Sequence, residues 1–509
     1  MRKLLEFSSS LIWYFIIFAK KRVKIFFRII FIIFILINFN LSAQNYDNVK
    51  LSKLEAYTDL STLYQYLTQS HPNINEVSDS IYLKNAFSNI FLSIDDSISI
   101  DEFFIRLVTI FSKIDDSHLT LNLDYYAYQK IFPKFFGGVV AFDNGKIYLL
   151  KDIARDSFFV NTRILSINDI DAIEIYNTLS DLSNADIGLK ATKDNNASLL
   201  FYYYFPIVYQ VKNFNSCILL NEMSNDTFQY SIDGISMRDI ESSQSFFSPY
   251  LEDLNNPYKF AIYPEINTAY LYVSDFLNNS YNTPSQLMPI VLSNLRKYKI
   301  ENLIIDLRGN LGGYVRVAED FLKYFMTEPF IFVKNYRVHP SKWTDKILLN
   351  NGQTQREWYN FFLTLNSINN KEMRLLKAGY NGPVLYEERK ATKPHKKHFD
   401  GNIYVLTDGG SISAAALAAN LLSHRPNTFL VGLPPGGTKK GTFGQSKRIY
   451  LPNSKISFSL SLLEFTQFPE YNREPIDIDF PLPWAQPNFN NPIKDPWVQF
   501  VIKKINRKE

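Results

Sequence analysis

Hydrophobic positions between residues 45 and 121 follow a helical spacing. Apolar side chains recur every three or four residues, as at Leu60, Leu63 and Leu67, which predicts a mostly helical region. The spacing changes to strict alternation at Leu119 and Leu121, which is typical of a half-buried strand. We therefore expect a helical segment that ends in a strand, with residue 118 at the change of period.

Short β-prone runs dominate residues 135–234. Between them, Ala172–Leu182 has the spacing of an amphipathic helix. Strands are predicted at Gly138–Phe142, Lys146–Leu150, Ile164–Asn168, Phe201–Val211 and Cys217–Leu220. A β-rich unit of this size is typical of a small binding module. The stretch Ser242–Asn256, rich in serine, asparagine and proline, predicts the linker that leaves it.

Residues 258–483 alternate between apolar strands and helices. Strands are predicted at Ala269–Val273, Asn302–Leu307, Ile403–Leu406 and Thr428–Val431, and helices at Pro284–Tyr298, Ala318–Met326 and Ala414–Leu422. Near-continuous apolar strands separated by helices indicate an α/β layer with a mostly parallel sheet. The predicted fold class is therefore α/β within an α+β multidomain chain, and a site is expected beyond the carboxyl ends of the strands.

The N-terminus has the pattern of a secretory signal. The basic cluster Lys20–Arg28 precedes the apolar run Ile29–Leu41, and small residues follow up to Ala43. The apolar run is short for a membrane span, so cleavage after Ala43 and export to the periplasm or the extracellular space are expected. An uncleaved segment would instead anchor the protein in a membrane. The expected domains are residues 1–43, 44–130, 131–245, 256–485 and a C-terminal tail, 486–509.

Composition excludes several classes of function. The net charge of +4 over 509 residues gives no broad basic face for nucleic acid. A single cysteine, Cys217, rules out an intramolecular disulfide framework, and none of the six histidines forms an H-x-x-x-H pair. Neither glycine-rich phosphate-binding motif is present. No metal and no cofactor are expected, and a membrane contact is expected only through the N-terminal segment.

The strongest candidate chemistry lies in the turn before Ala414. A strand ends at Leu406, the glycine-rich turn Asp408–Ser413 follows, and an alanine-rich helix begins. Ser411 and Ser413 both lie in this turn. One of them is either a helix N-cap or a nucleophile, because the first N–H groups of a helix can face a developing oxyanion.

Two motifs resemble the tail-specific, or C-terminal-processing, serine peptidase family. Asp306–Gly313 resembles the family's D-x-R-x-N-x-G-G signature, and Val405–Ala415 resembles the stretch around its nucleophile. By this resemblance the nucleophile is Ser413. The stretch Asn161–Asp171 resembles part of PDZ-like domains, which hold a peptide by adding it as a strand. The resemblance implies a PDZ-like insert ahead of a peptidase core.

A serine nucleophile needs a base, and the resembled family offers two. In one branch the base is a histidine in a D-[GS]-H turn, which corresponds here to His118, with a late glutamate, Glu470, as its acid. Glu474 is an alternative acid. In the other branch the base is a lysine, which corresponds to Lys440. We favour His118, because imidazole titrates near neutral pH whereas lysine must first be desolvated.

The oxyanion needs two N–H donors. The N–H of Ala414 is one candidate, and that of Gly312 or Gly313 is the other, since glycine lets the main chain approach closely. The sequence thus predicts an exported serine endopeptidase that acts on unfolded or C-terminal segments of a protein or peptide substrate. The alternative is a catalytically inactive peptide- or hydrophobe-binding protein on the same fold.

Overall fold

The computed structural model describes residues 50–123, 131–132, 134–214, 216–236, 239–240, 257–277, 283–349, 383–388 and 390–507. The predicted signal segment, the linker Ser242–Asn256 and most of residues 351–397 lie outside these ranges. Within the described ranges, no helix has the length and apolar character needed to cross a membrane.

The N-terminal part is helical, as predicted. Its helices are α2 (Lys53–Ser70), α3 (Ile74–Val77), α4 (Ser80–Leu92) and α5 (Ile100–Phe111), and a small sheet joins β1 (Lys50–Ser52) to β2 (Ser97–Ser99). Side-chain caps begin the three longer helices, at Ser52, Asp79 and Ser99. The last strand of this part, β3 (Thr120–Asn122), pairs with β22 (Ser457–Leu460), which also pairs with β21 (Lys447–Tyr450). This pairing brings residues near position 118 to the C-terminal half of the chain.

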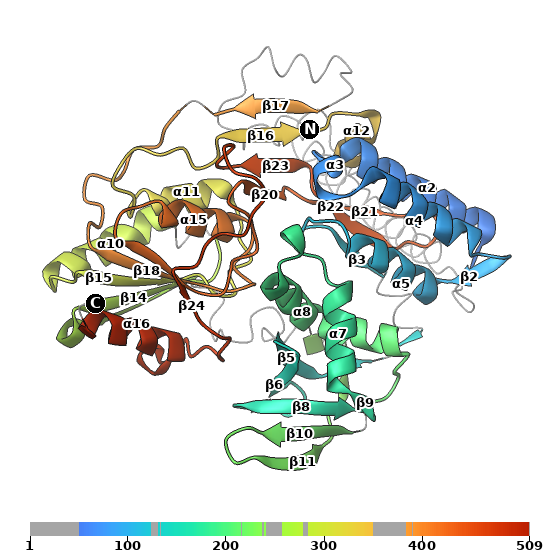
Figure 1. Cartoon of the computed structure of the whole chain (residues 1–509), viewed down its shortest axis with the longest axis horizontal. Helices are drawn as coiled ribbons and strands as arrows, with labels where there is room; N and C mark the ends of the chain where they lie inside the picture. Colours follow the sequence, from blue (N-terminus) through green and yellow to red (C-terminus); the bar gives the residue numbers. More distant parts are fainter. Residues whose placement is uncertain are drawn as a thin grey trace, which may run out of the picture. The chain divides into compact units, whose positions relative to one another are not determined.

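An antiparallel sheet forms the middle of the chain (Figure 1). Its strands are β5 (Gly138–Asp143), β6 (Lys146–Asp152), β7 (Ser157–Phe158), β8 (Thr162–Ile167), β9 (Ile170–Asp171), β10 (Cys217–Asn221) and β11 (Asp226–Tyr230). The main order is β11-β10-β8-β6-β5, so β5 is an edge strand. A separate pair joins β4 (Phe135–Phe136) to β12 (Gly234–Ile235), and helix α7 (Ala172–Leu182) has the predicted bounds.

The strand predicted at Phe201–Val211 is wrong. Phe201–Tyr209 belong to helix α8 (Lys190–Tyr209), which follows the short 3₁₀ helix η1 (Asp186–Gly188), and Gln210 ends the helix in a left-handed conformation. Aromatic side chains fill this part of the helix, and Phe201 and Phe205 stack on each other with ring centroids 5.2 Å apart. A helix that is buried on several sides has apolar residues all around it. Its sequence therefore lacks the polar stripe by which an amphipathic helix is identified.

The C-terminal half contains the mostly parallel sheet that the sequence predicts. Its order is β13 (Tyr258–Tyr263), β14 (Thr268–Val273), β15 (Asn302–Asp306), β18 (Asn402–Thr407), β19 (Thr428–Gly432) and β24 (Phe480–Pro481). Every neighbouring pair is parallel except β13 with β14. Helices α10 (Pro284–Lys297), α11 (Val315–Leu322) and α15 (Ala414–Ser423) lie on one face, and α16 (Pro496–Arg507) lies on the other (Figure 1).

A second sheet stands beside this layer. Its order is β17 (Val384–Glu387), β16 (Asn335–Val338), β23 (Leu463–Thr466) and β20 (Gly441–Gly444), all antiparallel. The remaining elements are α12 (Lys342–Leu349) and the short turns η3 (Pro264–Ile266) and η4 (Pro492–Lys494). The mixed α/β multidomain fold is therefore confirmed.

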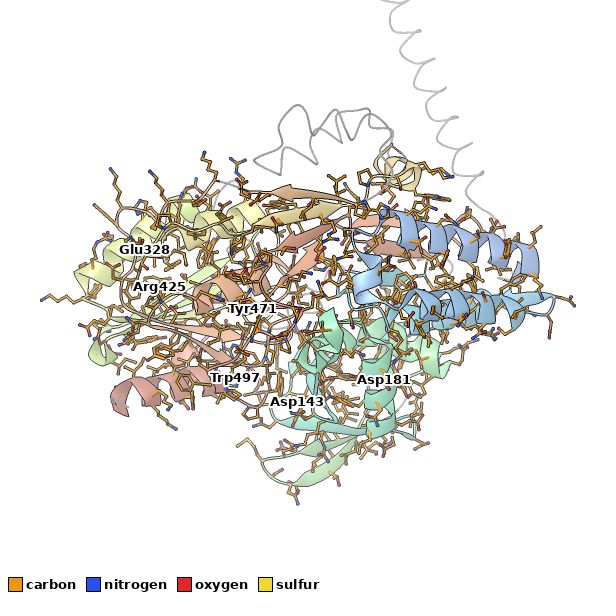
Figure 2. The ribbon with its side chains drawn as sticks, turned by 45° about the horizontal axis from the view of Figure 1, so that its top comes forward. Asp143, Asp181, Glu328, Arg425, Tyr471 and Trp497 are labelled. Atoms are coloured by element: carbon orange, nitrogen blue, oxygen red, sulfur yellow. The ribbon has the colours of Figure 1, made fainter. Side chains whose placement is uncertain are left out.

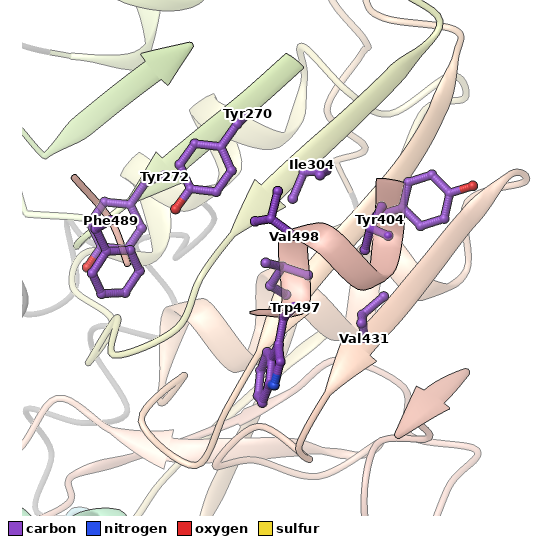
Figure 3. Close-up of a cluster of buried hydrophobic side chains, with 10 residues drawn as sticks. Tyr270, Tyr272, Ile304, Tyr404, Val431, Phe489, Trp497 and Val498 are labelled. Atoms are coloured by element: carbon purple, nitrogen blue, oxygen red, sulfur yellow. The ribbon is translucent and has the colours of Figure 1, made fainter. Parts of the chain in front are cut away.

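The C-terminal residues complete the core of the parallel sheet. Trp497 and Val498 of α16 pack against sheet residues that include Tyr270, Tyr272 and Tyr404 (Figure 3). The segment after residue 485, predicted only as a tail, thus buries apolar surface on one face of the sheet. On burial each large side chain of this kind contributes about 1.5–3 kcal/mol to stability.

Arginine side chains satisfy main-chain and carboxylate groups inside this half. Arg425 (Figure 2) donates to the carbonyl oxygens of Phe325, Phe399 and Gly401 at 2.7–3.0 Å. It thereby joins the residues after α15 to two other segments, the turn after α11 and the stretch before β18, because buried carbonyl groups need hydrogen-bond partners.

Candidate active site

Two glycine-rich loops meet at the carboxyl ends of β15 and β18. The main chain of Ile412 donates to the carbonyl oxygen of Asn310 at 3.0 Å, which joins one loop to the other. Asp408 accepts N–H bonds from Gly309 and Gly410, both at 2.9 Å. The strand ends and the two loops are therefore one hydrogen-bonded structure, as expected for a site at this edge of a parallel sheet.

The charged residues of the first loop have a structural role. Arg308 is 1% exposed and bonds Asp306 at 2.6 Å and Asp495 at 3.0 Å. The guanidinium also lies over the rings of Phe489 and Trp497. A buried charge persists only when paired, so this network fixes the base of the loop.

Ser411 is part of the loop's internal bonding. Its hydroxyl donates to the carbonyl oxygen of Leu307 at 2.8 Å and accepts from the N–H of Asp408 at 3.1 Å, and the residue is fully buried. A hydroxyl held in this way cannot reach a substrate.

Ser413 is half-buried and has the backbone geometry of a nucleophile. It is the N-cap of α15. Its backbone angles, φ of 58° and ψ of −123°, lie in a region that residues other than glycine rarely adopt. Such a conformation costs about 1–3 kcal/mol and concentrates at functional sites. Among the described residues its hydroxyl makes no cap bond and no other hydrogen bond, and it lines a cleft of about 1100 Å³.

Three main-chain N–H groups near Ser413 are candidate oxyanion donors, those of Gly312, Gly313 and Ala414. One of the three already donates a hydrogen bond. Gly312 donates its N–H to the side chain of Asn310 at 2.9 Å, so this N–H already has an acceptor. In the described part of the chain, the N–H groups of Gly313 and Ala414 donate to no acceptor. These two remain as the candidate donors.

Gly312 nevertheless shapes the site. It has a φ of 97°, and a methyl group on its Cα would lie 2.6 Å from Cβ of Ser413 and 2.8 Å from the carbonyl oxygen of Ile412. The paired glycines therefore allow the first loop to pass directly against the serine.

The cleft in front of Ser413 has an apolar wall and a charged rim. Its apolar lining comes from Phe332, Val333, Tyr336, Leu417, Leu463 and Phe465. The rim carries both signs of charge, including Arg316 and Glu388. A wall of this kind accepts apolar side chains of a substrate, while mixed charge at the rim suits peptide main chain and polar groups.

His118 lies close to Gly444, a neighbour of residues that line the cleft of Ser413. Its Nε2 is 3.8 Å from the position that a methyl group on Gly444 would occupy, and Gly444 also lies against the ring of Phe465. Gln445, the next residue, and Phe465 both line the cleft of Ser413. Nε2 of His118 therefore lies near Gly444, which adjoins two residues of the cleft lining, while His118 itself is not among the lining residues.

The opposite edge of the ring contacts a carboxylate. Nδ1 of His118 lies 3.5 Å from Asp116 and 3.4 Å from the hydroxyl of Ser117. Burial lowers the pKa of His118, but the hydrogen bond and charge of Asp116, with the charge of Asp186, outweigh it and the net shift is upward.

Lys440 is not placed as a base. Its ammonium pairs with Glu76 from the N-terminal helices and lies 3.7 Å from the buried Glu464. Its nitrogen thus contacts two carboxylates, and no contact with Ser413 is found in the described part of the chain. Its contacts instead join the helical segment to the second sheet.

Neither predicted acid contacts the histidine among the described residues. Glu470 is 56% exposed and lies 3.4 Å from Lys334, and Glu474 is 49% exposed and lies 3.8 Å from Lys439. The role of Glu470 stays a prediction from the order of motifs. Sequence reasoning missed Asp116 as a contact of the ring, although the D-S-H turn that contains it was the signal.

A second, smaller cavity lies beside the middle sheet. It has a volume of about 300 Å³ and is lined by edge strand β5, by α8 and by the two glycine-rich loops through Gly309 and Asp408. Asp143 at the end of β5 contributes to it (Figure 2). Trp484 closes one side and stacks on Tyr148 with ring centroids 5.0 Å apart.

Serine hydrolases place the nucleophile in a strained strand-to-helix turn of this kind. Comparison with known proteins agrees with that class. Residues 267–467, about two fifths of the chain, match the model of Peptidase family S41.

A named relative matches part of this chain. The carboxy-terminal processing protease CtpB of Bacillus subtilis (strain 168) is 31% identical over 157 residues, which cover 30% of this chain and 22% of CtpB. The chain therefore matches less than a quarter of that relative's length.

Among solved structures, a CPAF mutant superposes with a TM-score of 0.63 at 13% identity, covering 89% of this chain and 97% of that one. Mature CPAF complexed with lactacystin gives 0.62 at 13% identity, covering 90% and 98%. At this identity the likeness shows a shared fold across almost the whole of both chains.

Proposed function

We propose that this protein is an exported serine endopeptidase that cleaves unfolded or C-terminal segments of other proteins. The observation that carries the proposal is Ser413, which stands in a strained turn with a free hydroxyl and faces a large cleft. Two N–H groups beside it, on Gly313 and Ala414, have no other acceptor among the described residues. The match of residues 267–467 to Peptidase family S41 supports the same chemistry.

The reaction begins when Oγ of Ser413 attacks the carbonyl carbon of a peptide bond. Its proton passes to Nε2 of His118, and the N–H groups of Gly313 and Ala414 stabilise the oxyanion. His118 then returns the proton to the leaving amine, which frees the new N-terminus. Water repeats the sequence on the acyl-enzyme and releases the new carboxyl group.

No hydrogen bond joins Ser413 to His118 in the described structure. Catalytic hydrogen bonds are commonly long without substrate and shorten when it binds. Residues on both sides of the cleft, Leu417 behind the serine and Phe465 near the histidine, would contact a bound peptide. We expect apolar side chains next to the cleaved bond for the same reason.

The β-rich module would hold a second part of the substrate by strand addition along β5. This strand is at the edge of its sheet and borders the 300 Å³ cavity. The N–H of Phe142 is already bonded to the hydroxyl of Ser198 at 2.9 Å, so an added strand would pair with the earlier residues of β5. A Val140→Pro variant, which removes one N–H there, should weaken peptide binding more than it slows cleavage of a short peptide.

The decisive test is hydrolysis of an unfolded protein by purified variants. Ser413→Ala and His118→Gln should each lose at least about 10³-fold in kcat/KM, and Ser413→Ala should lose labelling by a serine-directed phosphonate probe. Ser423→Ala, on the same helix, is the matched control and should stay active. Hydrolysis that persists in Ser413→Ala would remove this serine from the mechanism.

An inactive binding protein on the same fold makes a different prediction. Its wild type would bind unfolded peptide without cleaving it or reacting with the probe. Export is tested separately, by fractionating cells that produce the full chain and determining the N-terminal residue of the mature protein. A new N-terminus at Gln44 supports cleavage after Ala43, and an intact N-terminus in the membrane fraction supports an anchor.

A further inference from the structure

The carboxylate nearest to the His118 ring comes from its own turn. Oδ1 of Asp116 accepts the main-chain N–H of His118 at 2.9 Å and lies 3.5 Å from Nδ1 of the ring. Asp116 is fully buried, whereas the His118 side chain is 17% exposed. The aspartate is therefore held at the Nδ1 edge of the ring, opposite Nε2.

A second histidine holds the other oxygen of this carboxylate. Nε2 of His71 lies 3.1 Å from Oδ2 of Asp116, and both side chains are fully buried. The main-chain N–H of Asn73 donates to Nδ1 of His71 at 3.2 Å. Nδ1 is thus an acceptor, and the hydrogen-bond pattern assigns the ring proton to Nε2, which donates to Asp116.

The surrounding charges keep Asp116 ionised. Burial alone would raise the pKa of Asp116, but the hydrogen bonds that it receives from His118 and His71 lower it well below its usual value. Other charged groups close to this position include Asp186, which accepts the N–H of Ser117 at 2.8 Å, and Arg473, 3.4 Å from Asp186; Asp115 lies within electrostatic range of these two, and Lys193 within range of Asp115. Among these side chains the carboxylates outnumber the cations, which leaves a negative environment that favours a protonated Nδ1 on His118.

We propose that Asp116, fixed by His71, is the residue that positions His118 for catalysis. This proposal rests on the proposed serine peptidase function and assigns to Asp116 the task that motif order gives to Glu470. With its proton at Nδ1 directed to Asp116, the ring has the lone pair of Nε2 at its opposite edge, near Gly444. The imidazolium formed when Ser413 gives up its proton is then stabilised by a full charge that never leaves the aspartate.

The first experiment measures the contact without using catalysis. In the inactive Ser413→Ala protein, selectively ¹³C-labelled histidines are titrated by NMR, and the His118 signal is assigned with His118→Gln. Asp116→Asn should move the titration midpoint of His118 to lower pH, because a removed negative charge no longer favours the imidazolium. Asp400→Asn is the matched control: Asp400 contacts another histidine, His398, at 2.7 Å, so the His118 midpoint should stay unchanged in this variant.

The second experiment measures the consequence in the active enzyme. Asp116→Asn should lower kcat by roughly 10²–10⁴-fold with little change in KM, and should move the acidic limb of the kcat/KM profile to lower pH. His71→Gln keeps a donor near Oδ2 and should retain more activity than His71→Leu. A purely structural role of either residue would change the amount of folded protein but not the position of the limb.

Several results would overturn the proposal. One is an unchanged His118 midpoint in Asp116→Asn, and another is a downward shift in Glu470→Gln, which would make Glu470 the positioning acid. If Asp116→Asn does not fold, the His118 midpoint in His71→Leu and His71→Gln decides, since only loss of the donor should shift it. An inactive wild type would refute the peptidase function, while the titration would still report the contact.

Discussion

Gly312 gives the sharpest test of how the two loops build the site. In a Gly312→Ala protein, the new methyl group would lie 2.6 Å from Cβ of Ser413, 2.8 Å from the carbonyl oxygen of Ile412 and 3.0 Å from the main-chain nitrogen of Ala414. These neighbours are main chain or the first atom of a side chain. They cannot turn away as the end of a flexible side chain could.

The expected cost has two parts. A φ of 97° costs an alanine about 1–2 kcal/mol relative to glycine. Overpacking against fixed atoms adds about 1–3 kcal/mol, so the loss of stability should be about 2–5 kcal/mol. Relief of the contact must move Ser413, and a displacement near 1 Å at a catalytic group costs about 10²-fold in rate.

Gly145→Ala is the matched control. Gly145 has a φ of 84° in the turn between β5 and β6, and a methyl group there meets nothing within 4 Å. It should lose only the conformational part, about 1–2 kcal/mol, and keep its activity. The assays are denaturant unfolding and hydrolysis of an unfolded protein. Equal destabilisation of the two variants, or normal activity of Gly312→Ala, would show that the serine does not depend on this close approach.

Three further predictions follow from the same geometry. Arg308→Met should destabilise the protein by about 3–5 kcal/mol, because Asp306 and Asp495 become buried and unpaired; denaturant midpoints measure this, and a loss below about 1 kcal/mol would contradict it. Lys440→Met should keep kcat within about tenfold of wild type, whereas loss of hydrolysis in a folded variant would make Lys440 the base. A base works when it is deprotonated, so activity should rise with pH through the pKa of His118. Burial lowers this pKa, but the carboxylates of Asp116 and Asp186 raise it and the net shift is upward. The midpoint of the kcat/KM profile should therefore lie above the ordinary histidine value of about 6.5, and a midpoint below it would contradict the assignment.

Local patterns were sufficient for most elements of the parallel sheet. The predicted strand Ile403–Leu406 lies within β18, and the predicted helix Ala414–Leu422 lies within α15. Apolar strands and alanine-rich helices have strong local preferences, so their sequences predict them without knowledge of the partners. The same reasoning failed at Phe201–Val211, because a helix buried among aromatic rings has no polar stripe.

The sequence alone was thus sufficient to predict the fold class, to recognise the two motifs, and to place Ser413 between a strand and a helix. These depend on residues close together in sequence, whose spacing expresses their conformation directly. Only the tertiary structure decided which N–H groups near the serine are free and which carboxylate contacts His118. The N–H of Gly312 donates to the side chain of Asn310, and Asp116 contacts His71, 45 residues earlier in the chain. Such contacts depend on how distant segments pack, and packing leaves no periodic signal in the sequence.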